Sequence, residues 1–216
     1  MKKTLGLALA FAMLTLGAAQ RAEAVVILTF GQVGNLNTIT ATNNGAGSTT
    51  IAGTNIPVTI TQIDAGVATP ISAFLTLSAN NMGAATADAS GQITQHYMGS
   101  FSIVNGATNY LSGSFTDFVA GQGTGLTLTA ATPDVVNFNS SVIAASDLGL
   151  PRAISLAMAN VSPTVSIVAG SIGSFTSSIS GTFSATPAVA VPEPISLLLM
   201  GAGLTAVAVR ARRQKV

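Results

Sequence analysis

The sequence contains no cysteine. Disulfide bonds, cysteine-based zinc sites and thiol nucleophiles are therefore excluded. Stability has to come from the burial of apolar side chains and from backbone hydrogen bonds, because no covalent or metal cross-link of this kind is available.

Charged residues are also scarce, at 7% of the chain. Between residues 25 and 190, Arg152 is the only basic residue, and the acidic ones are all aspartates: Asp64, Asp88, Asp117, Asp134 and Asp147. A nucleic-acid-binding protein needs clustered lysines and arginines. This composition excludes a nucleic-acid partner.

Histidine occurs once, as His96. A Ser-His-Asp triad is formally available, but no Gly-x-Ser-x-Gly motif is present. The sequence also does not indicate which of the many serines would be the partner of the single histidine. We assign no catalytic residue and expect His96 to be exposed or at a strand edge. A secreted hydrolase with an unrecognised site stays an alternative.

The aspartates do not form a recognisable site. No close acidic pair of the kind used in glycoside hydrolysis is present, and no Asp-x-Asp-x-Asp run indicates calcium. Phosphate-binding and dinucleotide-binding fingerprints are missing too. Because Asp64, Asp88 and Asp134 lie in segments typical of turns, we predict no metal and no cofactor, and calcium at an aspartate-containing loop stays an alternative.

What is present begins with an export signal. Met1, Lys2 and Lys3 form a positive start, residues 4–19 are mostly apolar, and Ala22-Glu23-Ala24 supplies the small-x-small cleavage pattern. This order is typical of a secretory signal peptide over residues 1–24, removed by signal peptidase after Ala24. A retained N-terminal anchor is the alternative.

The last part of the sequence, residues 191–216, has three successive parts. Pro192-Glu193-Pro194 comes first, an apolar run follows over residues 195–209, and a basic tail over residues 210–216 carries Arg210, Arg212, Arg213 and Lys215. A helix of fifteen residues spans about 22 Å, which is short against a hydrocarbon core of about 30 Å. We expect a temporary hold in the inner membrane, with the basic tail on the cytoplasmic side.

This ordered tail resembles the PEP-CTERM sorting signal of Gram-negative bacteria. The resemblance implies recognition and removal of the tail by an exosortase, an integral-membrane transpeptidase-like cysteine enzyme. A plain C-terminal tail anchor is the alternative. The resemblance covers residues 191–216 only, so it implies a destination and a processing partner but no activity for the rest.

Residues 25–190 form a domain rich in serine, threonine, glycine and asparagine. Apolar and polar residues alternate over residues 57–63, 110–119 and 173–183, which indicates half-buried antiparallel strands. Shorter strands are expected over residues 25–30, 73–77, 92–97, 100–104, 125–129, 154–158 and 165–168. Glycine and asparagine turns separate them, and Asn105-Gly106 is the clearest hairpin signal.

These patterns predict an all-β fold, with a single antiparallel β-sandwich or open barrel flanked by a signal-peptide helix and a C-terminal transmembrane-type helix. A short helical turn is expected over residues 142–148, capped by Ser140 or Ser141. Glycine also precedes phenylalanine by two positions at Gly99, Gly113, Gly173 and Gly181. We interpret each glycine as a small residue two positions before an aromatic side chain that covers the next strand.

The sequence as a whole predicts an exported, non-enzymatic protein that reaches the cell surface or the extracellular matrix. Its hydroxyl and amide side chains suit hydrogen bonding to extracellular polysaccharide. A self-assembling or adhesive surface protein is the second interpretation, since strand edges with few charges are poorly protected against pairing.

Overall fold

The computed structural model describes residues 24–34 and 38–187. Eleven strands form one sheet and two more form a small hairpin, and every pairing is antiparallel. The strands are β1 (Val25–Gln32), β2 (Ile39–Asn43), β3 (Thr49–Ile63), β4 (Ile71–Asn81), β5 (Thr86–Ala87), β6 (Ile93–Asn105), β7 (Thr108–Gln122), β8 (Gly125–Ala131), β9 (Val136–Asn139), β10 (Gly149–Ser162), β11 (Ile167–Val168), β12 (Ser171–Ile172) and β13 (Phe175–Thr186). The antiparallel all-β prediction is confirmed.

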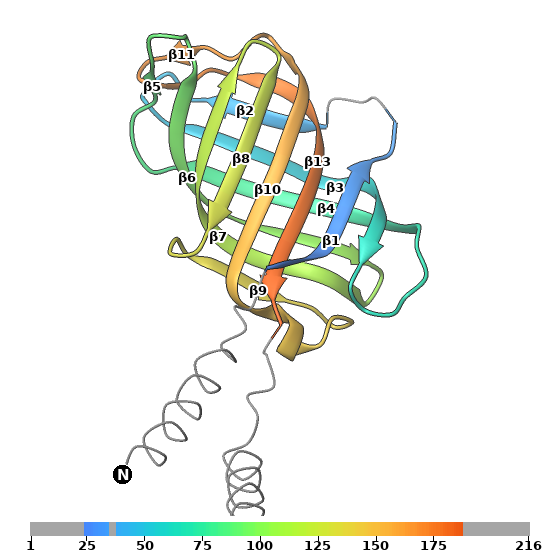
Figure 1. The fold of residues 1–216 in the computed structure, drawn as a ribbon. Coiled ribbons are helices and arrows are strands. Elements are labelled where there is room, and N and C mark those ends of the chain that lie inside the picture. Colours follow the sequence, from blue (N-terminus) through green and yellow to red (C-terminus); the bar gives the residue numbers. More distant parts are fainter. Residues whose placement is uncertain (1–23, 35–37, 188–216) are drawn as a thin grey trace, which may run out of the picture.

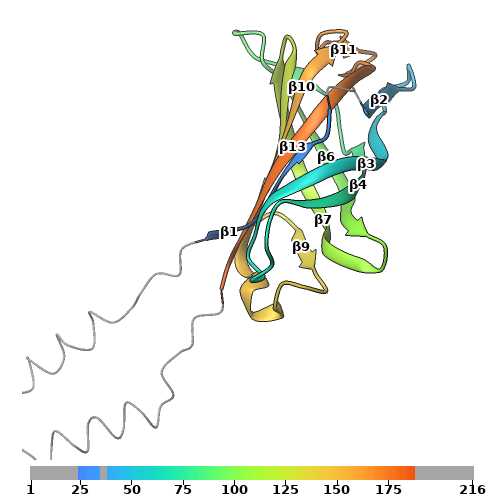
Figure 2. The same ribbon diagram turned by 90° about the vertical axis from the view of Figure 1, so that its right-hand side faces the viewer.

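The large sheet closes on itself (Figures 1 and 2). Its path runs β6-β4-β3-β1-β13-β10-β8-β7, and β7 pairs again with β6 to complete a barrel of eight strands. The β6–β7 hairpin makes the closure, and its turn contains Gly106 in the left-handed region at φ +57°. The fold is therefore neither of the two expected arrangements. It is not a β-sandwich, because the sheet is not split into two layers, and it is not an open barrel, because the barrel is closed.

At two places around the barrel, two consecutive strands lie end to end and together fill the place of one long strand. Both β1 and β2 pair with β3 on one side and with β13 on the other, one after the other along the same line. In the same way, β8 and then β9 pair with β7. The alternation pattern did not predict β2, β5, β9, β12 or the first half of β3.

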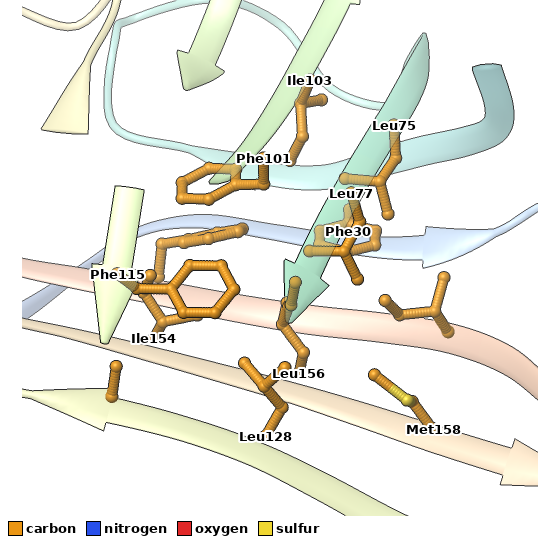
Figure 3. Packing of buried hydrophobic residues seen from close by; sticks show 14 of the residues in the cluster. Phe30, Leu75, Leu77, Phe101, Ile103, Phe115, Leu128, Ile154, Leu156 and Met158 are labelled. Atoms are coloured by element: carbon orange, nitrogen blue, oxygen red, sulfur yellow. The ribbon is translucent and has the colours of Figure 1, made fainter. Parts of the chain in front are cut away.

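The core fills the inside of the barrel. Alternate residues of each strand point inward, and register shifts between Gly53 and Ile56 keep the long strand β3 in phase with β4. Figure 3 shows Phe30, Phe101, Phe115 and Leu156 converging from different strands. Each of these side chains is at most 4% exposed. Barrels of eight strands are narrow enough for side chains to fill them in this way.

The glycines that precede phenylalanine do make room for neighbouring groups. A Cβ atom at Gly181 would lie 2.6 Å from Phe30 Cε1, whereas one at Gly113 would overlap the Asn137 carbonyl oxygen and lie 3.0 Å from Phe101 Cε1. At Gly99 the close neighbour is the backbone of Ser78 and Ala79 instead. An aromatic ring therefore fills the space beside Gly181, while Gly99 and Gly113 admit the backbone of a neighbouring strand and Gly173 faces Ser166 and Val168.

Some predicted elements differ in extent. Residues 92–97 and 100–104 belong to the single strand β6, and the expected strand at 165–168 is the short hairpin partner β11. The expected helical turn is the 3₁₀ helix η1 (Ala145–Leu148). Ser140 Oγ accepts hydrogen bonds from the amides of Val142 and Ile143, so this serine caps the approach to η1 and not η1 itself.

The two ends of the barrel are different. The first strand begins and the last strand ends at one end, where Val25 pairs with Ala185; we call it the proximal end. The opposite, distal end carries the turns at 44–48, 82–92, 123–124 and 163–174. Within the described ranges, no helix is long and apolar enough to cross a membrane. The expected signal-peptide helix and C-terminal helix lie outside those ranges.

Candidate functional site

The residues with predicted sorting roles lie outside the described ranges. This holds for Pro192, Glu193, Pro194, the basic tail residues and Ala22. Ala24 is the first described residue and is exposed, immediately before β1. The predicted cleavage position is thus directly beside the folded barrel.

His96 lies on the outer face of β6 and is exposed, as predicted. Asp88 lies in a turn at the distal end, whereas Asp64, Asp134 and Asp147 lie at the proximal end. Asp117 of β7 pairs in register with Tyr97, the residue next to His96 on β6. The described residues contain no group of three or more histidine and acidic side chains that could hold a metal ion.

Asp88 has a plain role in its turn. Its Oδ1 accepts hydrogen bonds from Ser90 Oγ at 2.7 Å, from the Ser90 amide at 2.8 Å and from the Gln92 amide at 2.9 Å. These bonds, the one from the Ser90 side chain above all, hold the pKa of the Asp88 carboxyl below its ordinary value. The carboxylate orders the turn between β5 and β6.

A buried polar cluster at the distal end was not predicted. Gln95 is 1% exposed, and its amide group forms hydrogen bonds to four residues inside the barrel. Its Nε2 donates to the Gly83 carbonyl at 2.6 Å and to Ser171 Oγ at 2.9 Å. Its Oε1 accepts from Tyr97 Oη at 3.1 Å and from the Ile172 amide at 3.0 Å.

Thr49, Asn43 and Asn81 extend this cluster toward the rim. Thr49 Oγ1 bonds to Ser171 Oγ at 2.7 Å and donates to the Ile172 carbonyl. Asn43 Nδ2 donates to the carbonyls of Val168 and Ile172 at 3.0 and 2.9 Å. Asn81 Oδ1 accepts from the Thr49 amide at 2.9 Å. These contacts fasten the β11–β12 hairpin across the distal end, and we call Asn43, Thr49, Asn81, Gln95, Tyr97 and Ser171 the distal lock.

A signal for part of the distal lock was present in the sequence. Ile93, Gln95 and Tyr97 alternate with exposed residues, which places the Gln95 amide on the inner face of β6. A buried amide needs partners. The sequence did not indicate the partner, Ser171, because 76 residues separate it from Gln95.

Tyr97 is the largest fully buried side chain. Burial raises the pKa of its phenol well above the ordinary value, because the phenolate would lose its hydration inside the barrel. Tyr97 therefore stays a neutral hydrogen-bond donor within the distal lock.

A shallow groove lies on the outer wall of the barrel near the distal end. It has a volume of about 260 Å³ and is lined by Thr40, Ala41, Thr42, Ser162, Pro163, Ser174, Phe175 and Thr176. Thr40 and Ser162 lie directly opposite Thr176 on the strands to either side, so their hydroxyl groups form a row across three strands. The lining contains hydroxyl groups and no charged side chain.

At the proximal end, Arg152 fixes the segment between β9 and β10. Its Nε donates to the Leu148 carbonyl at 2.7 Å and its Nη1 to the Val136 carbonyl at 3.2 Å. Its Cζ lies 5.8 Å from the centre of the Phe138 ring. Since it is engaged in these contacts, the single basic residue of the domain has a structural role.

Comparison with known proteins adds one match. No curated protein and no solved structure is significantly similar to the chain. The family described as the PEP-CTERM protein-sorting motif matches residues 190–213, only a few positions after β13 ends at Thr186. This match contains Pro192, Glu193 and Pro194 and agrees with the resemblance found in the sequence. Residues 190–213 of the chain thus carry a PEP-CTERM protein-sorting motif, which is consistent with a substrate of an exosortase.

Proposed function

We propose that the protein is a non-enzymatic component of the cell surface or of the extracellular polysaccharide matrix, delivered there by exosortase sorting. The observation that carries this proposal is the combination of the sorting motif at residues 190–213 with a barrel whose outer wall is rich in hydroxyl groups. The motif implies export and a membrane-anchored stage. The hydroxyl groups of the outer wall are suited to hydrogen bonding with matrix polysaccharide.

The last strand illustrates that chemistry. Its outward positions carry Thr176, Ser178, Ser180, Thr182 and Ser184 in succession. Neighbouring strands present further small or hydroxyl side chains opposite them, such as Thr29 and Ser155 beside Thr182. Such a surface donates and accepts hydrogen bonds without repelling a neutral or an acidic sugar polymer.

The groove near the distal end is the part of this wall best shaped for a sugar. Hydroxyl groups of Thr40, Thr176 and Ser162 lie on adjacent strands, which are about 4.8 Å apart. Pro163 offers an apolar surface beside them.

We expect the mature protein to migrate more slowly in gels containing a neutral polysaccharide, and Thr40→Val with Thr176→Val to remove most of this retardation. Thr127→Val on β8 is the control, and retardation equal in all three would contradict the groove.

The sorting part of the proposal is tested separately. Glu193→Ala removes the only charge of the Pro-Glu-Pro element but leaves the apolar run and the basic tail. A full-length membrane-bound form should accumulate, as it should in cells without the exosortase. Serine at Arg210, Arg212 and Arg213 should instead let uncleaved chains escape, because the basic stop is weakened. Mass spectrometry of membrane and secreted fractions distinguishes these forms, and normal maturation of the Glu193 variant would favour a plain tail anchor.

The closed barrel bears on the self-assembling alternative. Closure pairs both sides of the eight barrel strands and so removes most of the edges that an incoming strand could join. A mass that is independent of concentration in analytical ultracentrifugation is the expected result.

For the hydrolase alternative, loss of a hydrolytic activity in His96→Ala would overturn the non-enzyme proposal.

A further inference from the structure

The position of the sorting motif restricts where the barrel lies during its membrane-anchored stage. Strand β13 ends at Thr186, and residues 187–194 separate it from the apolar run that begins at Ile195. Eight extended residues span at most about 29 Å. The proximal end is therefore held close to the bilayer surface for as long as the tail is uncleaved.

Two exposed apolar side chains flank the point where the chain leaves the barrel. Val25 is 45% exposed on β1, where it pairs with Ala185 of β13. Leu150 is 64% exposed near the start of β10, next to Gly149, which pairs with Thr186. Leu150 has the largest exposed fraction of all large hydrophobic side chains in the described ranges. Water-exposed apolar groups beside a membrane tether gain by entering the interfacial region.

We propose that the proximal end, around Val25 and Leu150, is a membrane-facing surface that rests on the bilayer while the tail anchors the chain. The distal lock and the groove then point away from the membrane. This inference rests on the exported, sorted function proposed above, and it adds the orientation of the barrel and the surface that sets it.

The alternative orientation lays the barrel on its side. The tether is long enough to permit it, but the wall beside the exit point, formed by β1, β13 and β10, would then bring rows of serine and threonine against the lipid. The hydroxyl groups are well solvated by water, whereas the free energy of the exposed Val25 and Leu150 side chains falls when they leave water. The carboxylates of Asp64, Asp134 and Asp147 at the proximal end outnumber Arg152 and the amino group that cleavage after Ala24 would leave on Val25, so anionic lipid should weaken the contact.

The test uses the uncleaved chain, purified from cells without the exosortase and reconstituted in phosphatidylcholine vesicles with a headgroup spin label. Because the chain has no cysteine, a single fluorophore can be attached at one introduced cysteine. Three exposed alanines are suitable: Ala145 at the proximal end, Ala157 on the wall and Ala89 at the distal end. Quenching should be strongest for Ala145→Cys, weaker for Ala157→Cys and weakest for Ala89→Cys.

The apolar pair is tested in the same preparation. Val25→Ser with Leu150→Ser should lower the quenching at position 145 by half or more, whereas Val33→Ser with Val168→Ser, two exposed valines elsewhere, should leave it unchanged. Equal quenching at all three positions, or strongest quenching at position 157, would overturn the orientation alone. If the uncleaved chain failed to float with the vesicles, membrane anchoring itself would be wrong, and the sorting proposal would fall with the orientation.

Discussion

Inward-facing glycines decide how closely the aromatic rings pack in this core. Phe30 stacks on Phe183 with ring centres 6.0 Å apart, and Phe183 stacks on Phe101 at 4.7 Å. Gly181 lies two residues before Phe183 and directly opposite Phe30 in the register. The ring of Phe30 occupies the space that a side chain at position 181 would need.

Gly181→Ala should therefore destabilise the barrel. The added Cβ would lie 2.5 Å from Leu156 Cδ2 and 2.6 Å from Phe30 Cε1, well inside normal contact. Overpacking of this kind costs about 1–3 kcal/mol in the free energy of unfolding, which urea titration measures. Gly31→Ala is the matched control, because no atom lies within 4 Å of its Cβ position. Equal stability of the two variants would contradict the packing argument.

Tyr97 makes stability depend on alkaline pH. Burial holds the pKa of its phenol above the ordinary value, so above about pH 10 the unfolded chain releases a proton that the folded chain retains. The free energy of unfolding should then fall by up to about 1.4 kcal/mol per pH unit, whereas below pH 9 this group contributes no slope. Urea titrations of the wild type and Tyr97→Phe between pH 8 and 11 measure it. A wild-type slope no steeper than that of Tyr97→Phe would refute this account.

At the scale of elements, the β11–β12 hairpin is tied to the barrel by polar contacts. The two strands form only a two-strand sheet of their own, and such a hairpin is marginally stable alone. Asn43, Thr49 and Gln95 hold it from three different strands. The distal end is thus closed by hydrogen bonds to side chains, while the rest of the barrel is closed by strand pairing.

Gln95→Ala should loosen this hairpin first. The change leaves buried groups that had bonded to the amide without partners, at a cost of at least about 2 kcal/mol. Hydrogen exchange should accelerate at the Ile172 amide, which donates to Gln95 Oε1, before it does so in the β4–β6 pair. Gln62→Ala, at an exposed position on β3, is the control. Unchanged protection of Ile172 would show that the hairpin does not depend on the distal lock.

On the scale of the whole molecule, the barrel is closed only when its first and last strands meet. Residues 180–185 of β13 pair with β1 on one side and with β10 on the other. The sorting motif begins after these residues. Folding of the barrel and removal of the tail are therefore separable along the chain.

Two truncations test this separation. A chain ending at Val191 keeps all of β13 and should fold with the same unfolding midpoint as the longer chain. A chain ending at Ile179 loses the residues that join β1 to β10, so the open edges should cause aggregation. Soluble yield and size-exclusion chromatography measure the difference. A soluble monomer from the shorter chain would mean that ring closure is not needed for stability.

The sequence by itself determined the strand chemistry, the near absence of charge and the sorting signal. Alternation of apolar and polar residues is a local property, so the long strands β3, β7 and β13 were visible in part, and Asn105-Gly106 marked a real hairpin. The Pro-Glu-Pro element, apolar run and basic tail are likewise contiguous, and the family match covers them.

Only the tertiary structure decided that the sheet closes and what lies at its two ends. The short strands β2 and β9 exist because β3, β13 and β7 offer them open backbone groups, which no local pattern reveals. The contact of Gln95 with Ser171 and the row of Ser162, Thr176 and Thr40 join residues far apart in the chain. Such contacts depend on the register of the closed barrel, because pairing between distant strands, and not the character of any one segment, sets which side chains meet.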